Sequence, residues 1–290
     1  MKTQKVNYKT INVDGLNIFY REAGNKDKPN VLLLGGFPSS SITFTKLINE
    51  LKEDYHVIAP DYPGFGNSDT PSATEYNYTF ANLALAIEKF IDILGLNKFS
   101  LYAFDYGGPI GFRIASKRPE LIESLVIQNA NAYMNGIGPG FETAMPFLQN
   151  RNEETEKPIR FLFTLEGIKV FYLTGAENPE HINPDNYLSD LQFLSRPGLH
   201  DIHLDLLQNY MSNVGEYDNW QKYFRESQPA TLLVWGKNDP FFPEAAARAF
   251  LKDLPNAELH LYNTSHFALE EYGDEIAQNV KNFLKTVYNK

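Results

Sequence analysis

The hydrophobic positions of this chain follow two spacings, and the first is that of strands. Residues 9–21 (KTINVDGLNIFYR) alternate apolar and polar side chains on either side of Asp14-Gly15, a dipeptide typical of a tight hairpin turn. Residues 31–34 form an uninterrupted apolar run, which is typical of a strand covered on both faces. We therefore expect an antiparallel hairpin followed by a parallel sheet.

Helical spacing alternates with further strand patterns over the next hundred residues. Helices are predicted at 41–54, 79–94 and 107–116, and strands at 56–59, 98–104 and 125–128. Alternation of strands and helices with short loops predicts a mostly parallel, doubly wound sheet of the α/β class.

This alternation stops between residues 132 and 227. Aromatic residues and prolines become frequent there, short helical patterns occur at 158–174 and 202–213, and no convincing core strand is visible. Strand patterns resume at 231–235 and 258–262, with helices predicted at 243–253 and from about residue 270. We therefore predict a core formed by 1–131 and 228–290, with a helical cap, 132–227, inserted in it.

Composition narrows the class of partner. At 290 residues and 43% hydrophobic, the chain is long enough to bury a large core. A net charge of −10 argues against binding to nucleic acid or to an anionic membrane surface, so a small-molecule partner is expected. The chain has no cysteine, and its first ten residues lack the apolar stretch of a signal peptide, so we expect a cytoplasmic location.

The candidate chemistry centres on residues 101–111 (LYAFDYGGPIG). Small residues two before and two after a central side chain, here Ala103 and Gly107 around Asp105, are what a sharp strand-to-helix turn requires. The usual form of this turn is G-x-S-x-G, with a serine nucleophile at its tip. A carboxylate at the tip predicts an ester on the protein itself, although a loop that merely contains an aspartate and two glycines would read the same way.

Two more polar residues stand just beyond predicted strand ends. Asp239 and His266 follow Asp105 in the order nucleophile, acid, histidine. Asn129 and Asn131, after an earlier strand, are not acidic, which leaves Asp239 as the acid. The other histidines are expected to pack in strands (His56, His260) or to be solvated on the cap (His181, His200, His203).

Over nearly its whole length the chain resembles the α/β-hydrolase superfamily, and within it the epoxide hydrolases and haloalkane dehalogenases that use an aspartate nucleophile. The stretches that carry the resemblance are LLLGGFPSSS, DYPGFGNSD, AFDYGGPIGFRIA, LLVWGKNDPFF and SHFALEE. They are specific for the superfamily but not for a substrate.

The resemblance implies a two-step reaction on a small apolar electrophile, with water as the second substrate. Asp105 would attack an sp³ carbon and form an alkyl ester, and His266, supported by Asp239, would activate the water that hydrolyses it. The backbone N–H groups of Phe37 and Tyr106 would form the oxyanion hole. No metal or cofactor is implied.

The chain departs from these relatives at several positions. They usually have histidine where this chain has Gly35, so a hydrogen bond made by that histidine must be absent or replaced. Dehalogenases resemble one another in binding halide with Trp and Asn, where this chain has Tyr106 and Phe37. Epoxide hydrolases use two cap tyrosines to donate to the epoxide oxygen; Tyr210 resembles the second, and Tyr172 is a weaker candidate for the first.

These departures favour epoxide hydrolysis, with haloalkane or haloacid dehalogenation as the alternative. A ligand-binding relative that has lost the chemistry is a third possibility, which Gly35 makes conceivable. The intact set of Asp105, Asp239 and His266 counts against it.

Overall fold

The computed structural model describes residues 4–289, and its centre is one sheet of eight strands in the order β1-β2-β4-β3-β5-β6-β7-β8. Strand β2 is antiparallel to both of its neighbours, whereas the pairs from β4 through β8 are all parallel. The predicted fold class is confirmed: a mostly parallel, doubly wound sheet with a helical insert.

The strands are β1 (Asn7–Val13), β2 (Leu16–Ala23), β3 (Asn30–Leu34), β4 (His56–Pro60), β5 (Phe99–Phe104), β6 (Ile122–Gln128), β7 (Ala230–Gly236) and β8 (Glu258–Tyr262). The core helices are α1 (Thr45–Leu51), α2 (Phe80–Leu94), α3 (Gly107–Lys117), α12 (Glu244–Phe250) and α13 (Ala268–Tyr288). Between β6 and β7 lie α4 (Pro139–Glu142), α5 (Met145–Gln149), α6 (Glu153–Phe161), α7 (Leu165–Leu173), α8 (Pro184–Leu194), α9 (Leu199–Gln208), α10 (Met211–Val214) and α11 (Tyr217–Ser227).

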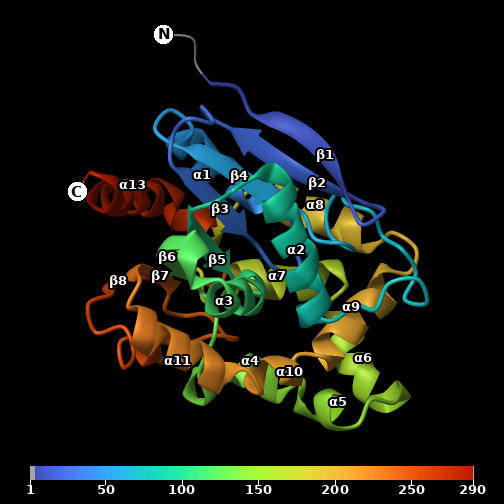
Figure 1. The fold of residues 1–290 in the computed structure, drawn as a ribbon. Helices are drawn as coiled ribbons and strands as arrows, with labels where there is room; N and C mark the ends of the chain where they lie inside the picture. Colours follow the sequence, from blue (N-terminus) through green and yellow to red (C-terminus); the bar gives the residue numbers. More distant parts are fainter. Residues whose placement is uncertain (1–3, 290) are drawn as a thin grey trace.

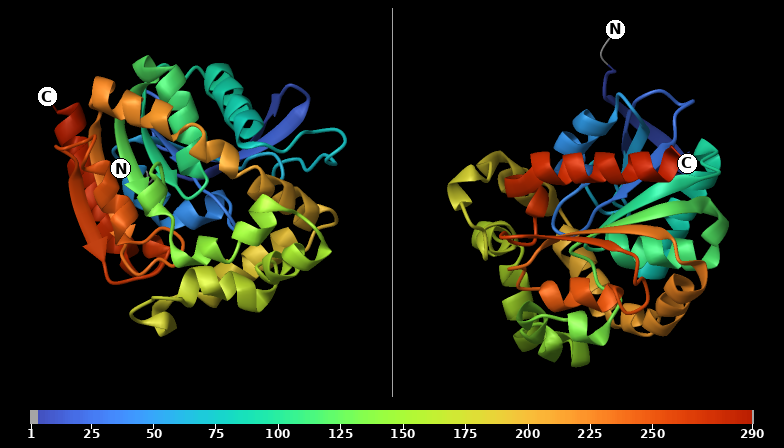
Figure 2. Two further views of the ribbon diagram at one scale, coloured as in Figure 1. Left: turned by 90° about the horizontal axis from the view of Figure 1, so that it is seen from below. Right: turned by 90° about the vertical axis from the view of Figure 1, so that its left-hand side faces the viewer.

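Helices cover both faces of the sheet because its central strands are apolar on both sides. All five residues of β4 and all six of β5 are buried. Helices α1 and α13 pack against each other on one face, and α2 and α3 pack together on the other (Figures 1 and 2). The opening hairpin forms the edge of the sheet, with its turn at Asp14 and Gly15, as predicted.

The insert lies beyond the carboxyl ends of the parallel strands, with α5 and α6 at its outer side in Figure 1. The single helical pattern predicted over 158–174 is wrong in one respect, because the structure has two helices there. The hydroxyl of Thr164 accepts a hydrogen bond from the Gly167 N–H, which begins α7 after a break. Gly167 is needed at this turn because a Cβ there would lie 2.0 Å from the Phe161 carbonyl oxygen.

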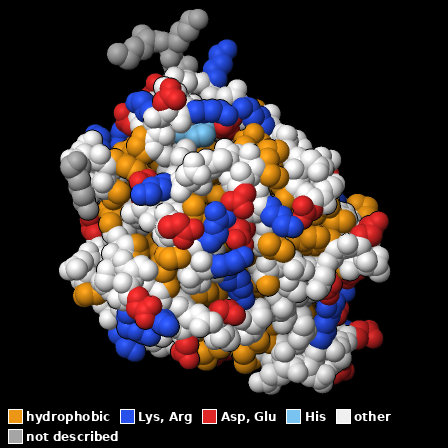
Figure 3. Space-filling view, in the orientation of Figure 1, with side chains coloured by type: hydrophobic (Ala, Val, Ile, Leu, Met, Phe, Trp, Pro, Cys, Tyr) orange, Lys and Arg blue, Asp and Glu red, His pale blue; other side chains and the backbone are white. Residues whose placement is uncertain are grey.

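The surface carries charges of both signs. On the face drawn in Figure 3, blue and red side chains are interspersed. Ion pairs such as Lys117–Glu88 and Arg118–Asp92 join the end of α3 to α2. Within residues 4–289, no helix combines the length and apolar character that crossing a bilayer requires.

Candidate active site

Asp105 occupies the sharp turn between β5 and α3. Its φ of +52° is in the left-handed region, which Asp and Asn tolerate better than most residues. The neighbouring backbone is close, since a Cβ on Gly107 would lie 2.0 Å from the Leu34 carbonyl oxygen. The predicted strand-to-helix turn is therefore present, with the carboxylate at its tip.

Two backbone N–H groups hold this carboxylate. The Phe37 N–H donates to Asp105 Oδ1 at 2.7 Å, and the Tyr106 N–H also hydrogen bonds to the carboxylate. Gly36 allows this approach because a Cβ there would lie 2.0 Å from the same Oδ1 atom. The two donors predicted from the sequence thus both reach the carboxylate of Asp105.

His266 lies between Asp105 and Asp239. Its Nδ1 is 2.7 Å from Asp239 Oδ2, and its Nε2 is 3.6 Å from Asp105 Oδ2 without another hydrogen-bond partner among the described residues. The imidazole is fully buried against Phe104, whose ring centroid is 4.9 Å away. Because β5, β7 and β8 end at the same edge of the sheet, the loops after them bring these three side chains together.

Asn129 completes the surroundings of Asp239. Its amide donates to Asp239 Oδ2 at 2.8 Å, and the Phe241 N–H donates to Asp239 Oδ1 at 2.7 Å. From the sequence, Asn129 had significance only because it is not an acid. Its position directly after a core strand was the available signal that it faces the same edge.

For both Asp105 and His266, burial and neighbouring charges shift the pKa in opposite directions. Burial raises the pKa of Asp105 to about 6, although the His266 charge and the two N–H donors lower it. Burial lowers the pKa of His266, but the charge and hydrogen bond of Asp239, together with Asp105, outweigh burial and raise it above its usual value. At neutral pH the site therefore favours an Asp105 carboxylate beside an imidazole that binds a proton readily.

The loop that contains Gly35 is held by a tyrosine. The Tyr62 hydroxyl donates to the Gly35 carbonyl oxygen at 2.8 Å. The space that a side chain at Gly35 would fill is taken by the Phe44 ring, whose Cε2 would be 3.3 Å from a Cβ there. The loop is thus anchored by Tyr62, and its N–H groups still reach Asp105.

A small cavity of about 50 Å³ opens onto Asp105. By the same measure one water needs about 10–15 Å³, so the space suits a small molecule. Its lining is mostly apolar, and of the described residues in it only Asp105, Tyr106 and His203 have polar side chains. The lining is Phe37, Asp105, Tyr106, Gly140, Phe141, Ala144, Ile159, Leu162, Phe163, Phe171, His203, Leu207, Phe241 and Phe242.

The two candidate cap tyrosines lie outside this lining. Tyr172 is directed away from the cavity, since its hydroxyl donates to Asp190 Oδ2 at 2.5 Å; its neighbour Phe171 lines the cavity instead. Tyr210 lies one layer behind, with its ring 6.4 Å from that of Tyr106 and 4.6 Å from that of Phe141. Tyr210 thus lies near enough to Asp105 for the carboxylate to raise its pKa, but its hydroxyl hydrogen bonds to Tyr217. Tyr172 is not brought to Asp105.

His203 differs from the sequence-based expectation of a solvated cap residue. Its side chain is 3% exposed and packs against the rings of Phe37 and Phe65, with centroids 5.3 and 4.7 Å away. The expectation failed because the short helical patterns of the insert did not reveal which side of α9 faces the core.

The fold and this site define a class. The family model of the alpha/beta hydrolase fold matches residues 29–272, so the chain belongs to the α/β-hydrolase fold family and is an α/β-fold hydrolase. The chain is 38% identical to an uncharacterized hydrolase of Saccharomyces cerevisiae, over 92% of this chain and 93% of the relative. It is 26% identical to epoxide hydrolase 4 of Homo sapiens, over 96% of this chain and 78% of that protein.

Among solved structures, haloalkane dehalogenase DatA from Agrobacterium tumefaciens C58 has a TM-score of 0.82 and 21% identity, covering 99% of this chain and 98% of that one. This similarity concerns the fold alone. In residues 4–289, no group of three or more acidic or histidine side chains is arranged to hold a metal ion.

Proposed function

We propose that this hydrolase acts through an ester between Asp105 and the alkyl group of a small electrophile, with an epoxide as the preferred substrate. Asp105 Oδ2 attacks an epoxide carbon, the carbon–oxygen bond of the ring breaks, and the released oxygen takes a proton. His266 then removes a proton from water, which attacks Cγ of the ester. The products are a diol and the regenerated carboxylate, so the net reaction adds one water.

The observation that carries this proposal is how unequally the two oxygens of Asp105 are held. Oδ1 accepts the Phe37 N–H at 2.7 Å, whereas Oδ2 is the oxygen that faces His266, 3.6 Å from its Nε2. Oδ2 is therefore the free nucleophile. When water attacks the ester, negative charge develops on Oδ1, which already accepts the Phe37 N–H, and the Tyr106 N–H also lies at this carboxyl group.

The lining of the cavity supports an epoxide over a halide. Haloalkane chemistry needs N–H donors around the leaving halide, and the described lining contains no Trp, Asn or Gln side chain. An epoxide oxygen needs a proton donor instead. The hydroxyl of Tyr106 in the lining and that of Tyr210 behind it supply phenols near Asp105, and we assign the donation to Tyr210 acting through Tyr106.

The test combines a substrate panel with intact-mass spectrometry of His266→Gln. Epoxides, haloalkanes, haloacids and carboxylic esters are assayed together, and the variant is expected to accumulate an adduct because only the second step needs the base. The control is Asp105→Asn, which should form no adduct.

An adduct that survives Asp105→Asn, or activity on carboxylic esters alone, would contradict the aspartate nucleophile. Faster halide release than epoxide opening would place dehalogenation first. A folded wild type that binds panel members without turnover or adduct would favour the non-catalytic alternative.

A further inference from the structure

Among the described residues that line the cavity, His203 is the one with a polar side chain that the proposed chemistry does not use. It lies on α9 and faces the same cavity as Asp105. Its ring is enclosed by aromatic side chains, with Phe65 at 4.7 Å, Phe37 at 5.3 Å and Phe163 at 6.4 Å between ring centroids. A polar group that is 3% exposed in such surroundings is costly unless something pairs with it.

The hydrogen-bonding state of this imidazole follows from its surroundings. Burial, followed by the nearby His200 and Arg196, lowers the pKa of His203 to about 3, so the ring is neutral and has a single N–H. The Gly64 carbonyl beside the ring can only accept, so it draws the N–H to its side. Nδ1 has no partner among the described residues, and a neutral ring keeps one nitrogen as an unpaired acceptor.

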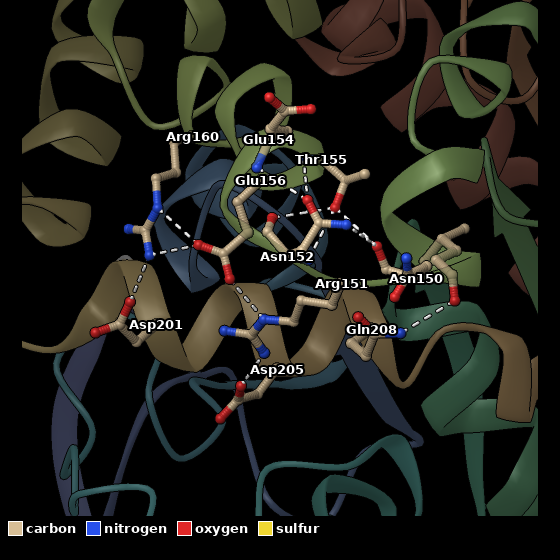
Figure 4. Close-up of polar contacts among 11 residues, drawn as sticks. Asn150, Arg151, Asn152, Glu154, Thr155, Glu156, Arg160, Asp201, Asp205 and Gln208 are labelled. Atoms are coloured by element: carbon tan, nitrogen blue, oxygen red, sulfur yellow. Dashed lines mark hydrogen bonds and ion pairs between the residues drawn. The ribbon is translucent and has the colours of Figure 1, made fainter.

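The opposite side of α9 is fixed by ion pairs, which set the direction of His203. Asp201 and Asp205, two residues before and after it, bind Arg160 at 3.0 Å and Arg151 at 2.5 Å, respectively (Figure 4). Both arginines also contact Glu156 on α6, so the network joins the two helices. Side chains two residues apart on a helix point to opposite sides. The ion pairs of Asp201 and Asp205 therefore leave His203 on the side of α9 that faces the cavity.

We propose that His203 determines substrate specificity by accepting a hydrogen bond from the substrate. The substrate class is then a small epoxide with an O–H or N–H group next to the reacting carbon, rather than a purely apolar one. This inference rests on the proposed function, because it places that carbon at Asp105 Oδ2. The small volume of the cavity favours a compact molecule over a long chain.

The experiment compares glycidol with 1,2-epoxybutane, which have the same number of non-hydrogen atoms and differ by a hydroxyl in place of a methyl group. The wild type should have the higher kcat/KM for glycidol. His203→Leu should lower the ratio of the two values by about tenfold or more, mainly through glycidol. His203→Gln, which keeps an acceptor, should restore part of the ratio, and His200→Leu, outside the lining, should leave it unchanged.

Circular dichroism and thermal melting confirm that each variant is folded. An unchanged ratio in a folded His203→Leu would assign the residue to packing and overturn the inference. A wild type that prefers 1,2-epoxybutane, or that accepts only larger apolar epoxides, would overturn it without any variant. Those results leave the Asp105 adduct intact, whereas loss of that adduct with every epoxide would remove the proposed function itself.

Discussion

At the scale of residues, two buried aspartates in one site are held in different ways. Asp239 accepts from Asn129 and the Phe241 N–H and lies 2.7 Å from His266 Nδ1, so both of its oxygens are engaged. Asp105 accepts the Phe37 N–H at Oδ1, and its Oδ2 faces His266 Nε2 at 3.6 Å, beyond hydrogen-bond distance. An attacking carboxylate needs an oxygen with a free lone pair, whereas a carboxylate that orients a histidine needs its oxygens held in place. This difference supports Asp105 as the attacking group and Asp239 as the residue that orients His266.

Tyr210 provides the residue-scale prediction about the leaving group. Its pKa is raised by burial, by the neighbouring Tyr217 hydroxyl and by the Asp105 carboxylate, which keeps the phenol protonated as a donor requires. Tyr210→Phe is therefore expected to lower epoxide turnover by roughly 10²-fold or more. Single-turnover measurement of ester formation checks this, with Tyr223→Phe, a buried tyrosine outside the lining, as the control. Full epoxide activity in Tyr210→Phe would remove the proposed donor.

At the scale of elements, helix α7 supports the loop that carries His266. The Ser265 hydroxyl donates to the Tyr172 carbonyl oxygen at 2.6 Å, and the Tyr172 ring stacks on Phe267 with centroids 4.0 Å apart. The Tyr172 hydroxyl donates to Asp190 on α8. Burial raises the pKa of Asp190 to about 7, although the hydrogen bond from Tyr172 lowers it. Tyr172 thus contacts both neighbours of His266 without reaching the cavity.

This placement predicts an effect of Tyr172→Phe on stability. The substitution leaves the fully buried Asp190 without its tyrosine donor, which should cost about 1–3 kcal/mol of unfolding free energy. Adding Asp190→Leu should recover part of the loss, because removing both partners leaves no unpaired group. Urea denaturation of the two single variants and the double variant measures this coupling. A double variant whose loss equals the sum of the single losses would contradict it.

The sequence predicted elements better than the orientations of side chains. The uniform apolar runs predicted the core strands, and each strand must be followed by a loop. Because parallel strands end at one edge of the sheet, these loops were expected to bring Asp105, Asp239 and His266 together. In the insert, helices of four to eleven residues turn by about 100° per residue, so Phe171 faces the cavity while Tyr172 faces α8. Such choices depend on packing against the core, which explains why His203 was missed.

At the scale of the whole molecule, the start of α13 holds the insert on the core. Glu270 accepts from Asn186 on α8 at 2.6 Å, and Glu271 accepts the Asn178 N–H at 2.7 Å. Burial raises the pKa of Glu270 to about 7, although Asn186 and Lys46 lower it. The closed insert therefore favours a protonated Glu270, in the same region as Asp190.

Closure of the insert should consequently weaken as pH rises. A carboxyl group whose pKa is raised in the closed state stabilises that state fully below its ordinary pKa of 4.5. The stabilisation is lost between pH 4.5 and about 7, and the stability of the closed state changes little above that pH. Hydrogen exchange of residues 176–195, corrected for its chemical rate, should show protection about tenfold higher at pH 5 than at pH 7.5. Glu270→Gln should reduce this difference relative to strand β5, and an undiminished difference would assign it to other groups.

The hydrogen bonds from Phe37 and Tyr106 to Asp105 also affect how such a protein is detected in a cell. Fluorophosphonate reagents label hydrolases by phosphonylating a serine hydroxyl at the turn, with loss of fluoride, and placing the phosphonyl oxygen on these N–H groups. Here the turn presents a carboxylate that already occupies the donors. A proteome-wide survey with serine-directed reagents would therefore pass over this protein, and reagents carrying a strained ring or an alkyl leaving group are the ones suited to find it.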